Sequence, residues 1–155
     1  MSICKRLNDL LSSFLLLPKL ASLRIDGFSQ VGKSFKRFKV IHSIVEEGFS
    51  NLVTLHLSGS NLSDEDLHII LECFPKLEDL NVSHSNFASI PQCIKGSFVL
   101  KILDVSYCRN LKESPELPIS IQKVDARLIL WTLNFKGIKR AMVHGLSTLS
   151  TILFV

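Results

Sequence analysis

The spacing of leucine residues restricts this chain to a small set of folds. A pattern of the form Leu-x-x-Leu-x-Leu begins at Leu52, returns at Leu77 and Leu100, and returns in a weaker form at Ile121. Successive copies begin 25, 23 and 21 residues apart. A unit of that length cannot bury its own apolar face, so the copies must stack and share one core.

Each copy of the pattern predicts one short strand. In the first copy Leu52, Leu55 and Leu57 should point inward, and Thr54 and His56 should point to the opposite face, because side chains alternate along a strand. Units of this kind stack into a leucine-rich-repeat solenoid with a parallel sheet on its concave side. We therefore predict a curved α/β solenoid of about five rungs.

An earlier segment, Leu20-Ala21-Ser22-Leu23-Arg24-Ile25, fits the same pattern. It begins 32 residues before Leu52, so this repeat carries an insertion. We assign residues 20–127 to the repeats and residues 1–19 to an N-terminal helical cap, because apolar residues in 1–19 recur at helical spacing. Residues 128–155 form an atypical apolar tail without the polar capping repeat that usually ends a solenoid.

The segments that return from one strand to the next differ along the chain. Ser63 and the acidic residues after it predict a capped helix start, and Pro75 predicts its end. Proline in the next two returns predicts tighter connections there. The ninth position of each repeat, which normally carries a buried polar residue, is occupied by Ser60, Ser85 and Cys108.

Composition excludes few functions. The net charge of +4 is mild and does not by itself imply nucleic acid. The four cysteines form no C-x-x-C pair, which argues against a zinc cage and fits reduced thiols in the cytosol. No run reaches the ~20 apolar residues of a membrane span. We therefore expect a protein of the cytoplasm or nucleus that has no membrane span, cofactor or nucleic-acid partner.

One motif supports a different interpretation. Residues Gly27-Phe28-Ser29-Gln30-Val31-Gly32-Lys33-Ser34 match the phosphate-loop pattern, in which Gly32 would turn the chain, Lys33 would reach phosphates and Ser34 would hold magnesium. Against this, the preceding strand alternates in polarity, whereas a central parallel strand should be apolar on both faces. The alternative remains a small nucleotide-binding protein that uses this loop.

The repeats resemble the leucine-rich region of plant intracellular immune receptors of the TIR-NBS-LRR class. The resemblance is carried by Leu62 to Leu67, Cys73 to Glu78, Leu103 to Cys108 and the closing run Glu116 to Arg127. It implies a C-terminal leucine-rich-repeat fragment of a disease resistance protein, which acts in defence as a recognition module and not as an enzyme. A receptor fragment without a function of its own is a further alternative.

The implied partner is a protein, either a pathogen effector, a host protein that the receptor guards, or the receptor's own other domains. The predicted binding surface is formed by the outward positions of the strands. Charge reversal at Asp79 and Asp104 should weaken partner binding while leaving the fold intact. The candidate residues are Arg24, Asp26, Thr54, His56, Ser58, Asp79, Asn81, Ser83, Asp104, Ser106, Lys123, Asp125 and Arg127, with Ser22 and Ile102 in the same columns.

Overall fold

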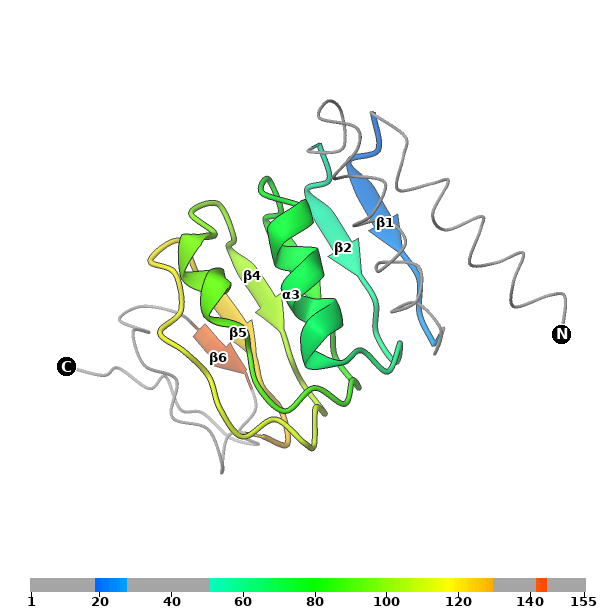
Figure 1. Ribbon diagram of the computed structural model, residues 1–155, viewed down its shortest axis with the longest axis vertical. Helices are drawn as coiled ribbons and strands as arrows, with labels where there is room; N and C mark the ends of the chain where they lie inside the picture. The colour runs from blue at the N-terminus through cyan, green and yellow to red at the C-terminus, as the bar shows by residue number, and fades with distance from the viewer. Residues whose placement is uncertain (1–18, 28–50, 130–141, 145–155) are drawn as a thin grey trace, which may run out of the picture.

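The structure is a computed structural model that describes residues 19–27, 51–129 and 142–144 (Figure 1). Six short strands form one parallel sheet in the order in which they occur along the chain. This order, with one strand in each repeat, confirms the predicted leucine-rich-repeat solenoid. The strands are β1 (Ser22–Arg24), β2 (Thr54–His56), β3 (Asp79–Asn81), β4 (Ile102–Asp104), β5 (Lys123–Asp125) and β6 (Met142–His144).

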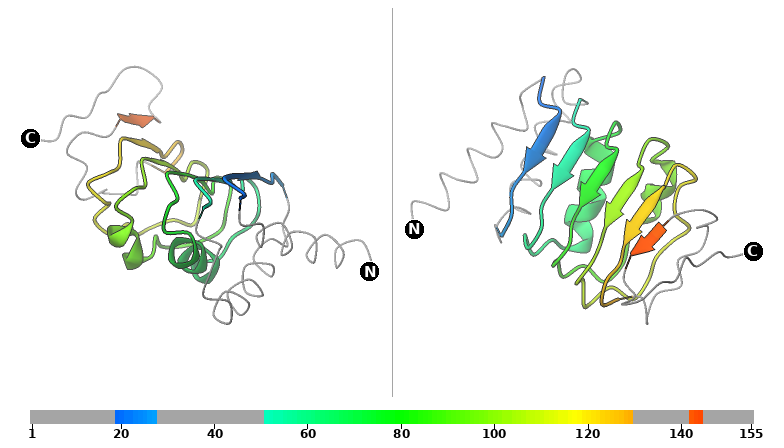
Figure 2. Two further views of the ribbon diagram at one scale, coloured as in Figure 1. Left: turned by 90° about the horizontal axis from the view of Figure 1, so that it is seen from above. Right: turned by 180° about the vertical axis from the view of Figure 1, so that it is seen from behind.

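The return segments lie on one side of this sheet. The helix α3 (Asp64–Cys73) and the 3-10 helix η1 (Gln92–Gly96) both pack there, and no described helix lies on the other side (Figure 2). We call the side opposite α3 and η1 the open face. The predicted helix and the tighter return after it are both confirmed.

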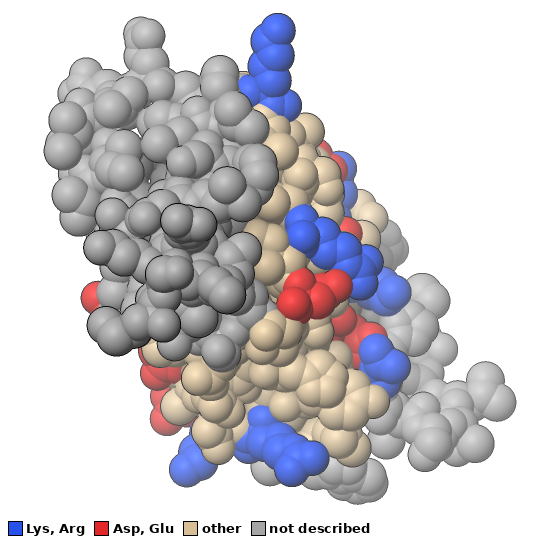
Figure 3. All heavy atoms as spheres, turned by 90° about the vertical axis from the view of Figure 1, so that its right-hand side faces the viewer, with Lys and Arg blue, Asp and Glu red and all other residues tan. Residues whose placement is uncertain are grey.

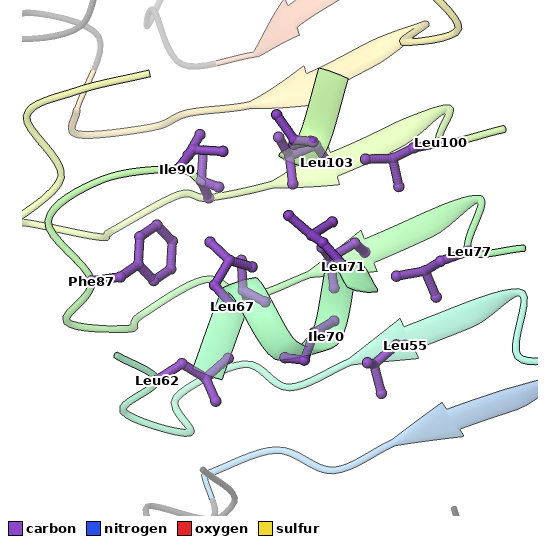
Figure 4. Packing of buried hydrophobic residues seen from close by; sticks show 14 of the residues in the cluster. Leu55, Leu62, Leu67, Ile70, Leu71, Leu77, Phe87, Ile90, Leu100 and Leu103 are labelled. Atoms are coloured by element: carbon purple, nitrogen blue, oxygen red, sulfur yellow. The ribbon is translucent and has the colours of Figure 1, made fainter. Parts of the chain in front are cut away.

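The core fills the space between the sheet and the helices (Figure 4). The central residues of neighbouring strands pair in register, so that Leu55, Leu80 and Leu103 form a continuous row that is at most 1% exposed. Leu67 and Ile70 of α3 pack against this row and are equally buried. Each such side chain contributes about 1.5–3 kcal/mol by leaving water, which is why the leucine period determines the fold.

The start of α3 is a capping box. The Ser63 hydroxyl accepts a hydrogen bond from the Asp66 backbone N–H at 3.3 Å, and Asp66 Oδ2 accepts one from the Ser63 N–H at 2.9 Å. Asp64 has a second role, since its Oδ1 accepts hydrogen bonds from Ala88 N at 2.6 Å and Ser89 N at 3.2 Å. The acidic first turn therefore fastens α3 to the next repeat as well as complementing the helix dipole.

Each of the strands β1 to β5 is followed by a residue in the left-handed backbone region. In successive repeats the backbone N–H of this residue donates to a carbonyl of the next repeat, as Gly59 does to Ser83 O at 2.9 Å. A left-handed residue thus ties each rung to its neighbour. The positions are Gly27 (φ 72°), Gly59 (70°), His84 (55°), Tyr107 (61°) and Leu128 (67°).

The ninth-position residues Ser60, Ser85 and Cys108 are buried, as expected. The Cys108 thiol donates to Val82 O at 3.4 Å. The Ser60 and Ser85 hydroxyls have no hydrogen-bond partner in the described part of the chain, so the expected polar ladder is formed only at Cys108.

The sheet extends beyond the repeats that we assigned. β6 pairs with β5 and places Val143 beside Val124, although Met142–His144 falls within the predicted tail 128–155. The sequence hides this strand because the two pattern positions around Val143 are Arg140 and Gly145 instead of leucines. The predicted cap lies outside the described residues, except for Lys19.

Candidate partner-binding face

The strand register gathers the predicted site residues into columns across the open face. The first column contains Ser22, Thr54, Asp79, Ile102 and Lys123, and the second contains Arg24, His56, Asn81, Asp104 and Asp125. The third column follows two residues after the second and contains Asp26, Ser58, Ser83, Ser106 and Arg127.

Side chains of the second column accept hydrogen bonds from backbone N–H groups just after strands β3, β4 and β5. Asn81 Oδ1 accepts a hydrogen bond from the Ser83 N–H at 3.0 Å, and Asp104 Oδ1 accepts one from the Ser106 N–H at 2.9 Å. Asp125 does the same for Arg127 at 3.3 Å. These are Asx turns, in which a short polar side chain binds the backbone two residues later. Asn81, Asp104 and Asp125 therefore have a structural role in addition to the binding role that we predicted.

Two residues of the predicted surface are not on the surface. Ser83 is 4% exposed and Ser106 is 1% exposed. The Ser83 hydroxyl contacts Ser58 Oγ at 2.9 Å, and the Ser106 hydroxyl donates to Asp104 Oδ1 at 2.6 Å. Alternation along a strand predicts which side of the sheet a residue faces but not how deeply its side chain is buried. Ser83 and Ser106 were therefore predicted to be exposed.

Two pairs of oppositely charged side chains form on the face, each between residues two positions apart in the chain. Arg24 Nε lies 2.8 Å from Asp26 Oδ2, and Arg127 Nη2 lies 2.9 Å from Asp125 Oδ2. The hydrogen bond to the partner aspartate, and then its charge, raise the pKa of both guanidinium groups, so both stay cationic. Acidic and basic groups accordingly lie next to one another on the surface (Figure 3). The Arg24–Asp26 pair is exposed and stabilises the fold little, whereas Asp125 in the second pair is only 14% exposed.

The side chains of His56 and Asp79 lie next to each other between β2 and β3. His56 Nε2 lies 3.1 Å from Asp79 Oδ2, but no hydrogen bond of acceptable geometry forms at this nitrogen. The two side chains are therefore in contact without a hydrogen bond between them.

Exposed apolar residues border the face where the strands begin, and the sequence analysis missed them. Phe98 is 77% exposed and Ile119 is 96% exposed, and each lies two residues before the first leucine position of its repeat. Ile102 on the face itself is 37% exposed. The sequence contains one signal for Phe98 and Ile119. Both occupy the same loop position in successive repeats, and an earlier repeat has Pro75 at that position.

The described chain contains only Gly27, the first residue of the phosphate-loop pattern. Gly27 has a φ of 72°, but this is the same left-handed turn that Gly59 makes in the next repeat. Gly32, Lys33 and Ser34 lie outside the described residues.

Within residues 19–27 and 51–129, no group of three metal-ligating side chains is arranged to hold an ion. None of the described helices is long and apolar enough to cross a membrane.

Comparison with known families supports the repeat assignment. Residues 1–118 match the family described as disease resistance protein RPS4B-like, leucine-rich repeats. The chain belongs to this family. The resemblance to plant disease resistance proteins is thus confirmed, and no solved structure matches the chain significantly.

The chain is also similar to disease resistance proteins of two plants. The TMV resistance protein N of Nicotiana glutinosa is 32% identical over 135 residues, which is 86% of this chain and 11% of that protein. The disease resistance protein RPP2A of Arabidopsis thaliana is 28% identical over 118 residues, or 76% of this chain and 8% of that protein. The chain therefore spans about a tenth of the length of these relatives.

Proposed function

We propose that this chain is the recognition module of a plant intracellular immune receptor and that it binds a protein through the open face. The observation that carries the proposal is a continuous parallel sheet whose outward side no described helix covers. Extended solenoid faces of this kind are typical surfaces for macromolecular binding. The names of the two relatives, TMV resistance protein N and disease resistance protein RPP2A, indicate that those proteins act in disease resistance.

The chemistry of the face favours a protein partner over a nucleic acid. Carboxylates recur on three of its neighbouring strands, at Asp79, Asp104 and Asp125, and these would repel phosphate groups. Lys123 is exposed beside them, and Ile102 offers apolar contact in the same column. An apolar centre with a polar rim is the usual arrangement of a protein interface.

Three partners fit this surface. They are a pathogen effector, a host protein that the receptor guards, and the receptor's own other domains. In each case the complex would form in the cytoplasm or nucleus, where the cysteines remain reduced. The module would act by binding and would catalyse no reaction.

A matched pair of lysine variants tests the assignment of the face. The 155-residue chain is displayed against a library of pathogen proteins, host proteins and receptor domains, and the selected partner is titrated calorimetrically as a purified protein. We expect Lys123→Glu on the open face to weaken binding at least about tenfold, or 1.4 kcal/mol. Lys95→Glu changes the same charge on the exposed surface of η1, on the other side of the sheet, and should leave the affinity unchanged. Equal losses in both variants, or a loss only in Lys95→Glu, would contradict the proposal.

A further inference from the structure

The side chains of Cys93, His68 and Glu72 lie next to one another on the helix side of the sheet. The Cys93 sulfur lies 3.3 Å from His68 Nδ1, and His68 Nε2 lies 3.0 Å from Glu72 Oε1. Cys93 belongs to η1, whereas His68 and Glu72 occupy successive turns of α3, and the two elements pack together (Figure 1). The cysteine and the histidine are 25 residues apart, so the stacking of repeats creates this arrangement.

His68 lies between the thiol and the carboxylate, with one ring nitrogen beside each of them. In the neutral tautomer that carries its proton on Nε2, the nitrogen beside the Glu72 carboxylate, Nδ1 is the acceptor that faces the thiol. A nucleophile beside a base that is itself oriented by a third group is the arrangement that activates cysteine and serine nucleophiles. It would allow His68 to receive the thiol proton.

Small reagents can reach this cluster. The His68 and Glu72 side chains are 44% and 41% exposed, and Cys93 is half-buried. By contrast, Cys73 and Cys108 are at most 3% exposed. The position of the base is fixed, because α3 has a capping box and is anchored in the core through Leu67, Ile70 and Leu71.

We propose that Cys93 is an oxidation site at which the thiol reacts with hydrogen peroxide or a small organic hydroperoxide, with His68 as base and Glu72 as the residue that positions His68. This modification is independent of partner binding at the open face. The charge of Glu72 favours an uncharged reagent over an anionic one.

The reaction balances within the site. The thiol proton passes to His68 Nδ1 while the sulfur attacks one peroxide oxygen. An S–O bond forms to the terminal peroxide oxygen and the O–O bond breaks. The leaving group, hydroxide from hydrogen peroxide or alkoxide from an organic hydroperoxide, takes the proton from Nδ1 to give water or an alcohol. The sulfur is oxidised by two electrons to a sulfenic acid, and the peroxide is reduced.

The resting state of the cysteine explains why a base is needed. Burial, and then the negative charge of Glu72, raise the pKa of the Cys93 thiol. Because the thiolate is the nucleophile, a protonated thiol reacts slowly unless a neighbouring group takes its proton. His68 is in hydrogen-bond contact to do so.

The test measures peroxide oxidation of the 155-residue chain, with dimedone as the trap for sulfenic acid and peptide mass mapping as the readout. We expect Cys93 to be trapped at least about tenfold faster than Cys73 and Cys108 in the folded chain. We also expect Cys93 to react faster in the folded chain than in the same chain in urea, because unfolding separates it from His68. An equal or slower rate in the folded chain would overturn the proposal without any variant.

Variants then assign the roles. His68→Asn should slow trapping at Cys93 at least about tenfold. His84→Asn, the same change at an exposed histidine with a φ of 55°, is the matched control, and asparagine tolerates that backbone conformation. Circular dichroism verifies that both variants fold. An unchanged Cys93 rate in folded His68→Asn would refute the role of the base.

Glu72→Gln tests the positioning role. It removes the negative charge beside the imidazole, and we expect the midpoint of the pH–rate profile for Cys93 oxidation to move to lower pH. His68 of α3 contacts the thiol, Glu72 of α3 acts on it through its negative charge, and Lys95 of η1 is exposed two residues away. A lower rate with an unchanged profile would mean that Glu72 acts only in packing.

Discussion

The imidazole of His84 stacks on the phenol ring of Tyr107, with the ring centroids 4.4 Å apart and the planes 6° from parallel. The two residues occupy the same position in adjacent repeats, and both have a left-handed backbone, with φ values of 55° and 61°. A side chain in this conformation costs about 1 kcal/mol relative to glycine. The contact between the rings offsets part of this strain. Arg127 adds a cation–π contact, with its Cζ 5.7 Å from the Tyr107 centroid.

A double-mutant cycle on His84→Ala and Tyr107→Ala should reveal this stacking. Alanine retains the backbone strain at both positions, so the coupling reports the ring contact alone. We expect a coupling energy of about 0.5–1.5 kcal/mol in urea unfolding of the 155-residue chain. The pair His84→Ala and Phe98→Ala, which changes an exposed ring at another position, should be additive. A coupling near zero for His84 and Tyr107 would mean that the stack contributes nothing to stability.

The same left-handed turn predicts a large effect of a small substitution at Gly59. Its φ is 70°, and a Cβ added there would lie 3.4 Å from Gly27 Cα. We expect Gly59→Ala to lower the free energy of unfolding by about 1–2 kcal/mol, chiefly through backbone strain.

Gly96→Ala is the matched control for this glycine. An added Cβ there meets nothing within 4 Å, and its backbone is not left-handed. It should be neutral or slightly stabilising, because alanine restricts the unfolded chain. Chemical denaturation of both variants measures the difference, and equal effects would contradict the argument.

The sequence predicted the features that depend on apolar periodicity. The row Leu55, Leu80 and Leu103 and the helix that begins at Asp64 follow from local patterns of two and 3.6 residues, and burial of apolar area drives both. β6 was missed because Arg140 and Gly145 replace the leucines that define a rung. β6 pairs with β5 through backbone atoms, and this pairing does not require a particular pattern of residue types in the sequence.

The candidate site was less predictable for a different reason. Alternation identified the columns of the open face but not the burial of Ser83 and Ser106. Nor did it reveal that Asn81 and Asp104 hold the strand ends through hydrogen bonds. Contacts such as the one between Cys93 and His68 join residues of different repeats, so they depend on how the repeats stack.

The hydrogen bonds of Asp104 revise the charge-reversal experiment at Asp79 and Asp104. Asp104 accepts hydrogen bonds from the Ser106 N–H at 2.9 Å, the Ser106 hydroxyl at 2.6 Å and Asn81 Nδ2 at 2.9 Å. We expect Asp104→Ala to destabilise the chain by about 1–3 kcal/mol, because partly buried partners lose their acceptor.

Asp79→Ala provides the comparison for Asp104→Ala on the same face. Its carboxylate lies near His56 but no hydrogen bond forms there, so the loss should be below about 0.5 kcal/mol. Reversal of Asp79 alone therefore tests binding without a change in the fold, whereas reversal of Asp104 changes both. Thermal unfolding distinguishes the two, and equal destabilisation would contradict the structural role of Asp104.

Cys108 gives the chain a predictable sensitivity to alkali. Burial raises the pKa of its thiol from 9.0 to about 12, against opposing hydrogen bonds from the backbone N–H groups of Ser85 and His84. Between pH 9 and 12 the thiol ionises in the unfolded chain but not in the folded one. Stability from this group is therefore complete below pH 9 and declines as the pH rises toward 12. From pH 8 to 10 the decline should reach about 1.4 kcal/mol.

Cys108→Ala isolates this contribution from the other groups that titrate in alkali. The variant loses the thiol and its hydrogen bond to Val82 O, so it should be less stable than the wild type at pH 8. Because the variant has no thiol to ionise at this position, the difference between the two chains should shrink by about 1.4 kcal/mol at pH 10. Urea unfolding at both pH values measures this difference. A difference that stays constant with pH would show that the Cys108 thiol ionises equally in the folded and unfolded chains.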